Sequence, residues 1–275
     1  MNNLKSQLVL IGVAALGITF ILIAMLRPGS PTLPSDGARD DTTPPSTGVQ
    51  QAEPQGTSSE HREVPIAEPA DDPAHVRLLR AASSGNVATV RALLVMGVDP
   101  DMAASEADVQ SMTSPPLELG ATALMLAARD SDVETIRVLL EAGASPHVAT
   151  ATGMTPLMIA SQRGQREIVV ALLSAGTDPN PKTTQGRTAL MLAARSGAHQ
   201  AVSLLLEAGA EIETADSDGA TALMHAAEAG QFEAVLVLLG GGANVMATDG
   251  RGRSAFDRAP SSGPVADVLR EAMGG

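Results

Sequence analysis

The octapeptide TALMLAAR occupies residues 122–129 and recurs letter for letter at residues 188–195. Related hexapeptides, TPLMIA at 155–160 and TALMHA at 221–226, continue the series, so the motif returns every 33 residues. A weaker copy, SAFDRA, begins a further 33 residues along, at Ser254. A fixed period of this length indicates stacked supersecondary units rather than one globular core.

A second landmark follows the second apolar run of each unit and keeps the same period. The tetrapeptides EAGA, SAGT, EAGA and GGGA begin at residues 141, 174, 207 and 240. The third residue of each tetrapeptide is glycine, and these glycines, with those at 164, 197 and 230, predict helix ends in a left-handed conformation. The threonine that opens each motif predicts a helix start, since its hydroxyl can accept an unpaired backbone N–H. Each unit is therefore predicted to be a helical hairpin.

The hexapeptide resembles T-P-L-H-x-A, the signature of the ankyrin repeat family, whose 33-residue unit contains a β-turn and two helices. The resemblance covers about residues 73–275 and implies an all-α solenoid of about six helix-turn-helix units with β-turn fingers. We assign the units to residues 73–101, 118–150, 151–183, 184–216, 217–249 and 250–275, with an insertion at 102–117. Such an insertion lengthens the first finger, and we expect disorder there, with contact to a partner as the alternative.

The chain departs from the family motif at the fourth position, where methionine replaces histidine. Flexible thioether side chains at matching positions of successive helices favour core packing over a metal or redox site. The first and last units diverge further from the motif, as expected of polar end caps. The methionines are Met125, Met158, Met191 and Met224.

The N-terminal region differs in composition from the repeats. After a short tail at 1–7, residues 8–26 carry no charge over 19 positions, about 28 Å of helix, which predicts a transmembrane signal anchor. A cleaved signal peptide is the alternative, but its apolar region is usually shorter. Residues 27–72, rich in Pro, Ser, Thr and acids, predict a disordered linker. The terminal amine and Lys5 precede this segment and only Arg27 follows it, which favours a cytoplasmic N-terminus, so we expect the array in the periplasm of a bacterium.

Composition excludes several classes of function. The chain has no cysteine, which removes disulfides, zinc–thiolate sites and thiol catalysis. Its net charge is −13, and an acidic array repels the phosphates of nucleic acids.

No hydrolase, metalloprotease, phosphate-loop or dinucleotide motif is present. We expect His225 to be a packed or solvated residue rather than a ligand. The stretch DSDG at 216–219 lacks the further ligands of a calcium loop. We expect no enzyme activity, cofactor, metal or small-molecule substrate.

The family resemblance implies that a protein partner binds at the finger tips and at the concave face of the first helices. Four arginines on these positions predict a basic cluster, and arginine is favoured at binding hot spots. The chain is thus predicted to be a non-enzymatic, membrane-tethered adaptor. Family analogy alone suggests the alternative, a periplasmic accessory to an enzyme system such as peroxide defence. The candidate partner-binding residues are Arg129, Asp130, Met154, Gln162, Arg163, Gln185, Arg187, Arg195, Ser217, Asp218 and Glu228.

Overall fold

The computed structural model describes residues 72–111, 118–130 and 132–274. The predicted tail at 1–7, the predicted membrane helix at 8–26 and all but the last residue of the predicted linker at 27–72 lie outside these ranges. Among the described helices, none combines the length and the apolar character that crossing a bilayer requires.

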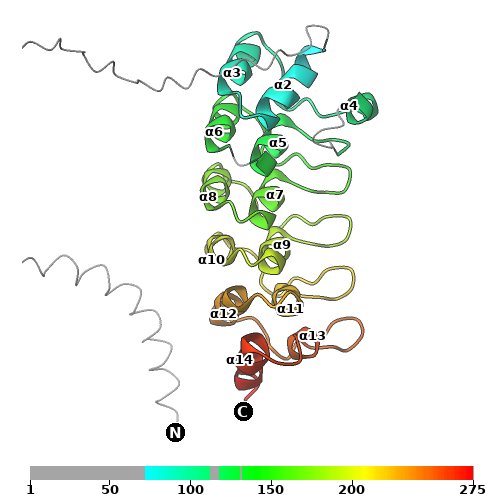
Figure 1. The fold of residues 1–275 in the computed structure, drawn as a ribbon, viewed down its shortest axis with the longest axis vertical. Coiled ribbons are helices and arrows are strands. Elements are labelled where there is room, and N and C mark those ends of the chain that lie inside the picture. The colour runs from blue at the N-terminus through cyan, green and yellow to red at the C-terminus, as the bar shows by residue number, and fades with distance from the viewer. Residues whose placement is uncertain (1–71, 112–117, 131, 275) are drawn as a thin grey trace, which may run out of the picture. The chain divides into compact units, whose positions relative to one another are not determined.

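The described part of the repeat region is a stack of helical hairpins (Figure 1). The first helices of the hairpins form one column and the second helices form another. Apart from an isolated bridge between Thr248 and Ser254, the described residues hold no β-structure, in agreement with the predicted all-α class. The pairs are α2 (Ala74–Ser83) and α3 (Val87–Val95), α5 (Ala123–Asp130) and α6 (Val133–Glu141), α7 (Pro156–Gln162) and α8 (Arg166–Ser174), α9 (Ala189–Ser196) and α10 (His199–Glu207), α11 (Ala222–Glu228) and α12 (Phe232–Gly240), and α13 (Ala255–Arg258) and α14 (Pro264–Ala272).

Most of the motif threonines begin a helix as predicted. The hydroxyls of Thr155 and Thr188 accept the backbone N–H three residues later, at 3.3 and 3.4 Å. Thr122 makes the same contact at 3.4 Å. Thr221 also directly precedes a helix, α11, but its side chain makes no cap bond, so the predicted role of the hydroxyl is wrong there.

The predicted glycine stops are confirmed by their backbone angles. Gly197 ends α9 at φ +76°, a conformation that costs other L-residues free energy. A Cβ there would also clash with Oε1 of Gln231 in the next unit. The other predicted stops have φ between +68° and +91°: Gly143, Gly164, Gly176, Gly209, Gly230 and Gly242.

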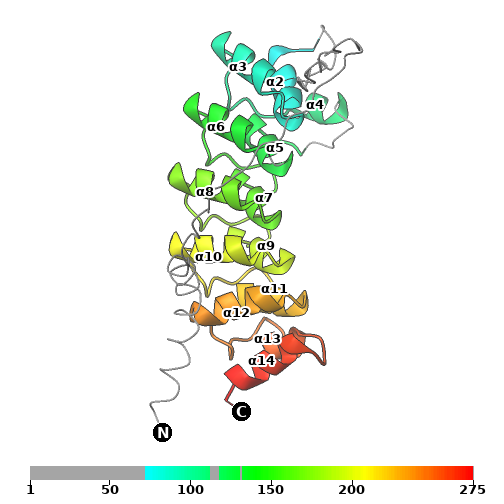
Figure 2. The same ribbon diagram turned by 60° about the vertical axis from the view of Figure 1, so that its left-hand side comes forward.

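Part of the insertion is ordered and packs on the first unit, which corrects the expectation of disorder. Residues Glu106–Ser111 form α4, which lies beside α2 (Figure 2). Asp108 is buried and accepts bonds from the backbone N–H and the hydroxyl of Ser105, at 2.8 and 2.7 Å. Its carboxylate also lies 3.2 Å from Nε2 of His75, on α2. The remaining residues, 112–117, lie outside the described ranges.

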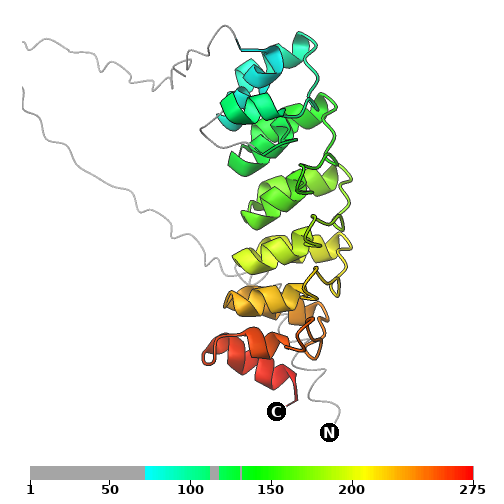
Figure 3. The same ribbon diagram turned by 90° about the vertical axis from the view of Figure 1, so that its right-hand side faces the viewer.

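The loops between successive hairpins follow one another along one side of the stack (Figure 3), and we call them fingers. Their tips are at residues 118–121, 150–154, 183–187, 216–220 and 249–253. Each finger leads directly into a first helix, so the fingers and the first helices border the same face of the array.

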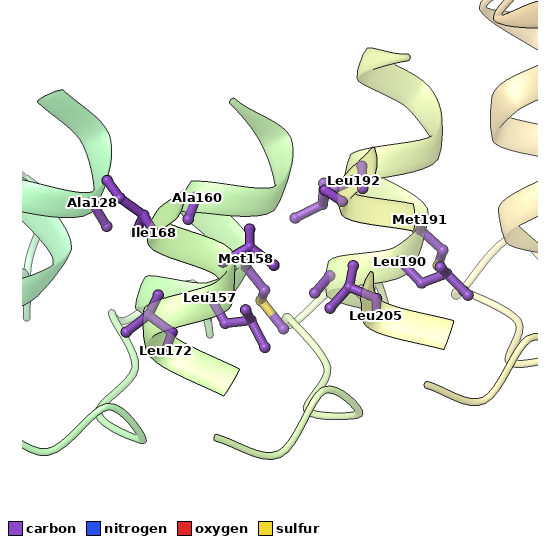
Figure 4. Close-up of a cluster of buried hydrophobic side chains, with 14 of the residues drawn as sticks. Ala128, Leu157, Met158, Ala160, Ile168, Leu172, Leu190, Met191, Leu192 and Leu205 are labelled. Atoms are coloured by element: carbon purple, nitrogen blue, oxygen red, sulfur yellow. The ribbon is translucent and has the colours of Figure 1, made fainter. Parts of the chain in front are cut away.

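Alanine, leucine and methionine side chains form a continuous core between the layers (Figure 4). Met125, Met158, Met191 and Met224 are each 1 % exposed, which confirms their predicted role in packing. Ala160 and Ala193 are fully buried where neighbouring first helices pack closely. Because each layer covers the apolar face of the next, truncating one buried leucine to alanine should cost about 3 kcal/mol.

Candidate functional site

The four fingers from 150–154 to 249–253 are each held by the residue at the base, which is threonine or aspartate. The backbone N–H of this residue donates to the carbonyl oxygen four residues later, at 2.9–3.0 Å. Its side-chain oxygen accepts the backbone N–H of that same later residue, at 2.9–3.1 Å. The base residues are Thr150, Thr183, Asp216 and Asp249, each 33 positions from the next.

Neighbouring fingers are joined to one another by backbone hydrogen bonds. The N–H groups of Ala151, Thr184 and Ser217 each donate to the preceding finger at 3.0 Å, and that of Gly250 donates at 2.8 Å. The fingers approach so closely that a Cβ on Gly219 would lie 2.6 Å from the nitrogen of Gly250. The row of fingers is therefore braced at every step, and it positions its side chains on a rigid support.

Two adjoining hollows lie where the fingers meet the first helices of units 2 to 4. The first has a volume of about 250 Å³ and the second about 280 Å³. Both are lined by Glu118, Met154 and Gln162, so we treat them as one groove. Small-molecule sites usually enclose about 300–1,000 Å³. Each hollow by itself lies just below that range, and its volume is enough for a single protein side chain.

The floor of the groove is apolar and its rim is polar. Met125, Leu126 and Ile159 line the first hollow, and Leu192 lines the second. These side chains come from the first helices, whereas the rim comes from the finger tips and the carboxyl ends of those helices. The rim residues with charged or amide side chains are Glu118, Arg129, Gln162, Arg163, Gln185 and Arg187.

The arginines of the groove differ in their partners. Arg129 is bonded to the carboxylate of Asp130 at 3.0 Å and to the hydroxyl of Ser83 at 3.3 Å. Arg163 and Arg187 have no ion pair with any described residue, and the buried Nε of Arg187 has no hydrogen-bond partner there. Because guanidinium groups are always charged, these two arginines give the rim a local positive charge.

The structure brings together six of the eleven candidate residues. Arg129, Met154, Gln162 and Arg163 line the first hollow, and Gln185 and Arg187 line the second together with Met154 and Gln162. That these residues bind a partner stays a prediction.

The other candidates lie outside the groove. Asp130 accepts a bond from Ser83 at 2.8 Å. Arg195 is exposed at the end of α9, so the predicted cluster of four arginines is reduced to three in the groove. Glu228 pairs with Arg258 at 2.6 Å. Ser217 and Asp218 are exposed on a later finger tip.

The apolar floor is the part of the groove that the motif analysis did not select. Leu126, Ile159 and Leu192 follow the motif methionine directly, at the variable position of the hexapeptide. The same position holds His225 in unit 5 and Arg258 in unit 6. This change from apolar to basic residues is visible in the sequence and marks where the apolar floor ends.

In units 5 and 6 the same positions are occupied by hydrogen-bonded polar pairs. Asp216 lies 2.8 Å from Nε2 of His225, and Asp249 lies 3.2 Å from Nη1 of Arg258, nine residues away in each case. In units 3 and 4 the residues at these positions are threonine and an apolar side chain, which form no such pair. The array therefore has an apolar floor in units 2 to 4 and hydrogen-bonded polar pairs at the corresponding positions of units 5 and 6.

The pairs in units 5 and 6 shift the pKa values of their members. Burial lowers the pKa of His225; the bond to Asp216 opposes this shift, and the charges of Arg258 and Arg187 add to it. Burial alone would raise the pKa of Asp216, but bonds from Ala220 and His225 outweigh it and hold that pKa below its ordinary value. His225 is thus a packed residue, and the carboxylate of Asp216 is engaged by its own finger and by His225.

Comparison with protein families agrees with the repeat geometry. A model described as ankyrin repeats, in three copies, matches residues 78–183 and 175–249. The chain belongs to the ankyrin repeat family. The comparison with curated proteins finds no match. Ankyrin repeats generally mediate interactions between proteins, and the family is typically non-enzymatic, so a protein is the class of partner that the fold indicates.

Proposed function

We propose that this ankyrin repeat protein is a non-enzymatic adaptor that binds a protein partner in the groove of units 2 to 4. The observation that carries the proposal is the pair of arginines, Arg163 and Arg187, which have no ionic partner among the described residues and lie beside an apolar floor. An apolar centre with arginine at its edge is the composition of an energetic hot spot. The row of braced fingers supports it, because a rigid surface loses little entropy on binding.

We further propose that the adaptor is tethered to a membrane. Residues 8–26 have the length and composition of a spanning helix, and residues 27–72 separate that segment from the array. With a cytoplasmic N-terminus, the array would lie in the periplasm, where it would present the groove to an envelope protein. A phosphatase that works only outside the cytoplasm, fused after Gly275, should be active; an inactive phosphatase with a fluorescent cytoplasmic fusion would reverse the orientation.

Site-specific photo-crosslinking in cells tests the binding surface. A benzophenone amino acid at Gln162, which lines both hollows, should form an adduct of defined mass with a partner. The matched control is Val170 on α8, which is 37 % exposed on the column of second helices. Adducts of the same yield from both positions, or none from Gln162, would remove the proposed function.

A further inference from the structure

Resting on the proposed function, we propose that the groove takes an extended acidic segment of its partner. Two apolar side chains of this segment, three residues apart, enter the two hollows. Its carboxylates pair with Arg163 and Arg187.

The spacing of the hollows selects the conformation of the segment. The hollows belong to neighbouring layers, and packed helices lie about 8–10 Å apart. In a polyproline II helix, residues three positions apart lie on one side, about 9 Å from each other. Same-face residues of a β-strand lie about 7 or 13 Å apart and match this spacing less well. The groove therefore fits a polyproline-type segment with apolar residues at every third position.

The polar rim supports an extended segment over a helical one. Gln162 and Gln185 are exposed and carry amide groups that can both donate and accept hydrogen bonds. Thr183 and Thr184 add hydroxyls at the edge of the second hollow. An extended segment has free backbone N–H and C=O groups to pair with these side chains, whereas a helix has satisfied its own.

The charge of the groove selects the chemistry of the segment. Its lining holds three arginines and one carboxylate, Glu118, and the hydroxyl of Thr152 donates to that carboxylate at 3.1 Å. The chain as a whole carries −13, so the groove is a local basic exception on an acidic protein. An acidic segment is attracted here and repelled elsewhere, which places it in one position. Arginine also pairs with carboxylates through two parallel bonds.

Peptide binding to the full chain in mild detergent tests the inference. The probe is a fluorescein-labelled decapeptide with two leucines three positions apart, separated by proline and glutamate and flanked by glutamates. In 50 mM salt it should bind the parent chain measurably by anisotropy. Versions with lysine for glutamate, or serine for leucine, should bind at least about tenfold more weakly, since a factor of ten is only about 1.4 kcal/mol.

A pair of matched variants locates the binding site. Arg163→Glu with Arg187→Glu should weaken binding at least about tenfold, while Arg137→Glu with Arg166→Glu should change it less than about twofold. Both pairs alter the net charge equally, but Arg137 and Arg166 lie on the second helices α6 and α8. Far-ultraviolet dichroism would establish that each variant keeps the parent fold. Equal weakening by both pairs, or equal binding of the lysine peptide, would overturn the inference.

The same measurements separate this inference from the proposed function and from other occupants. A specific adduct at Gln162 without acidic-peptide binding would leave the proposed function standing and overturn only the inference. Binding that appears only when residues 28–71 are deleted would assign the groove to the chain's own acidic segment. A dimer that the Arg163→Glu and Arg187→Glu changes dissociate would assign it to a second copy. Either of these last two results also overturns the inference.

Discussion

Nε2 of His225 lies 2.8 Å from the carboxylate of Asp216, and their side chains are 6 % and 4 % exposed. The pair connects the first helix of unit 5 to the base of the finger before it. The charges of Arg187 and Arg258, which come from the units on either side, both lower the pKa of His225. The pair thus lies in a charged cluster that extends over units 4 to 6.

Acidification should weaken the array through His225. Its pKa is lowered in the folded state by burial, so as the pH falls below about 6.5 the unfolded chain binds a proton that the folded chain does not. The free energy of unfolding should therefore fall by up to about 1.4 kcal/mol per pH unit in this range. Asp216 adds a further loss below about pH 4, because its lowered pKa keeps the folded carboxylate ionised.

Urea denaturation at pH 7.5 and 5.5 would measure the effect of acidification, followed by far-ultraviolet dichroism because the chain has no Trp or Tyr. His225→Gln should reduce the difference between the two pH values. The exposed His199 is the control, and His199→Gln should leave the difference unchanged. An unchanged difference in His225→Gln would contradict the assignment.

Exchanging the His225–Asp216 pair for the residues of unit 4 should be tolerated only as a double change. His225→Leu alone removes the hydrogen bond from His225 to Oδ2 of the buried Asp216 carboxylate and should cost about 2–3 kcal/mol. Asp216→Thr with His225→Leu reproduces Thr183 and Leu192, and we expect a cost within about 1 kcal/mol of the parent. A double variant as unstable as the single one would show that the two positions are not coupled.

The contact between fingers can be isolated with two equivalent glycines. Gly219 and Gly252 have φ of +79° and +77°, so alanine at either position costs about 1 kcal/mol for the backbone. Only at Gly219 would the new Cβ also meet the next finger, 2.6 Å from Gly250; at Gly252 no heavy atom lies within 4 Å. Gly219→Ala should therefore be less stable than Gly252→Ala by about 1–3 kcal/mol. Equal denaturation midpoints would refute the close contact.

The motif threonines differ in whether the hydroxyl caps the following helix, and this difference can be tested. Thr188 caps α9 through its hydroxyl, whereas Thr221 makes no cap bond. Replacing each by valine keeps the shape of the side chain and removes the hydroxyl. Thr188→Val should cost about 1 kcal/mol more than Thr221→Val in chemical denaturation. The reverse order would mean that Thr221 uses its hydroxyl in solution.

A stabilising change follows from the glutamines that link neighbouring layers. The amides of Gln165 and Gln231 donate to the backbone carbonyls of Arg129 and Arg195, at 3.4 and 3.3 Å. Ala198 stands at the same position between them and has no such group. Ala198→Gln would reach the carbonyl of Gln162 and should raise the free energy of unfolding by about 0.5–1 kcal/mol. A loss of stability would indicate that the added side chain does not fit beside Gly164.

The repeat period predicted the hairpins, because each layer has to present the same cap, alanine and leucine to its neighbour. Thr155, Gly197 and Met191 could be assigned roles from their place in the period alone. Thr221 could not, since whether a hydroxyl caps a helix depends on its final geometry. The order of residues 104–111 was missed because it depends on Asp108 meeting His75, across 33 residues of chain without a repeat signal.

The groove could be predicted only in part. Family resemblance selected positions on the fingers and helix ends, and six of these meet in the hollows. It did not show which arginines already have an ionic partner. Arg129 is paired with Asp130, whereas Arg163 has no ion pair with any described residue. The resemblance also did not select Ile159 and Leu192, which line the bottom of the two hollows. Pairing and volume are properties of side chains brought together by folding, and a repeat pattern does not encode them.

The hydrogen bonds between fingers also bear on how such a chain can change over generations. Each finger between the first and the last receives a bond from the finger after it and gives one to the finger before it, at positions 33 residues apart. A duplicated unit would bring a matching donor and acceptor, and a deleted unit would remove both together. Genes for this architecture can therefore lengthen or shorten by whole repeats without changing the hydrogen bonds between neighbouring fingers. The size of the binding surface is thus open to selection independently of its chemistry.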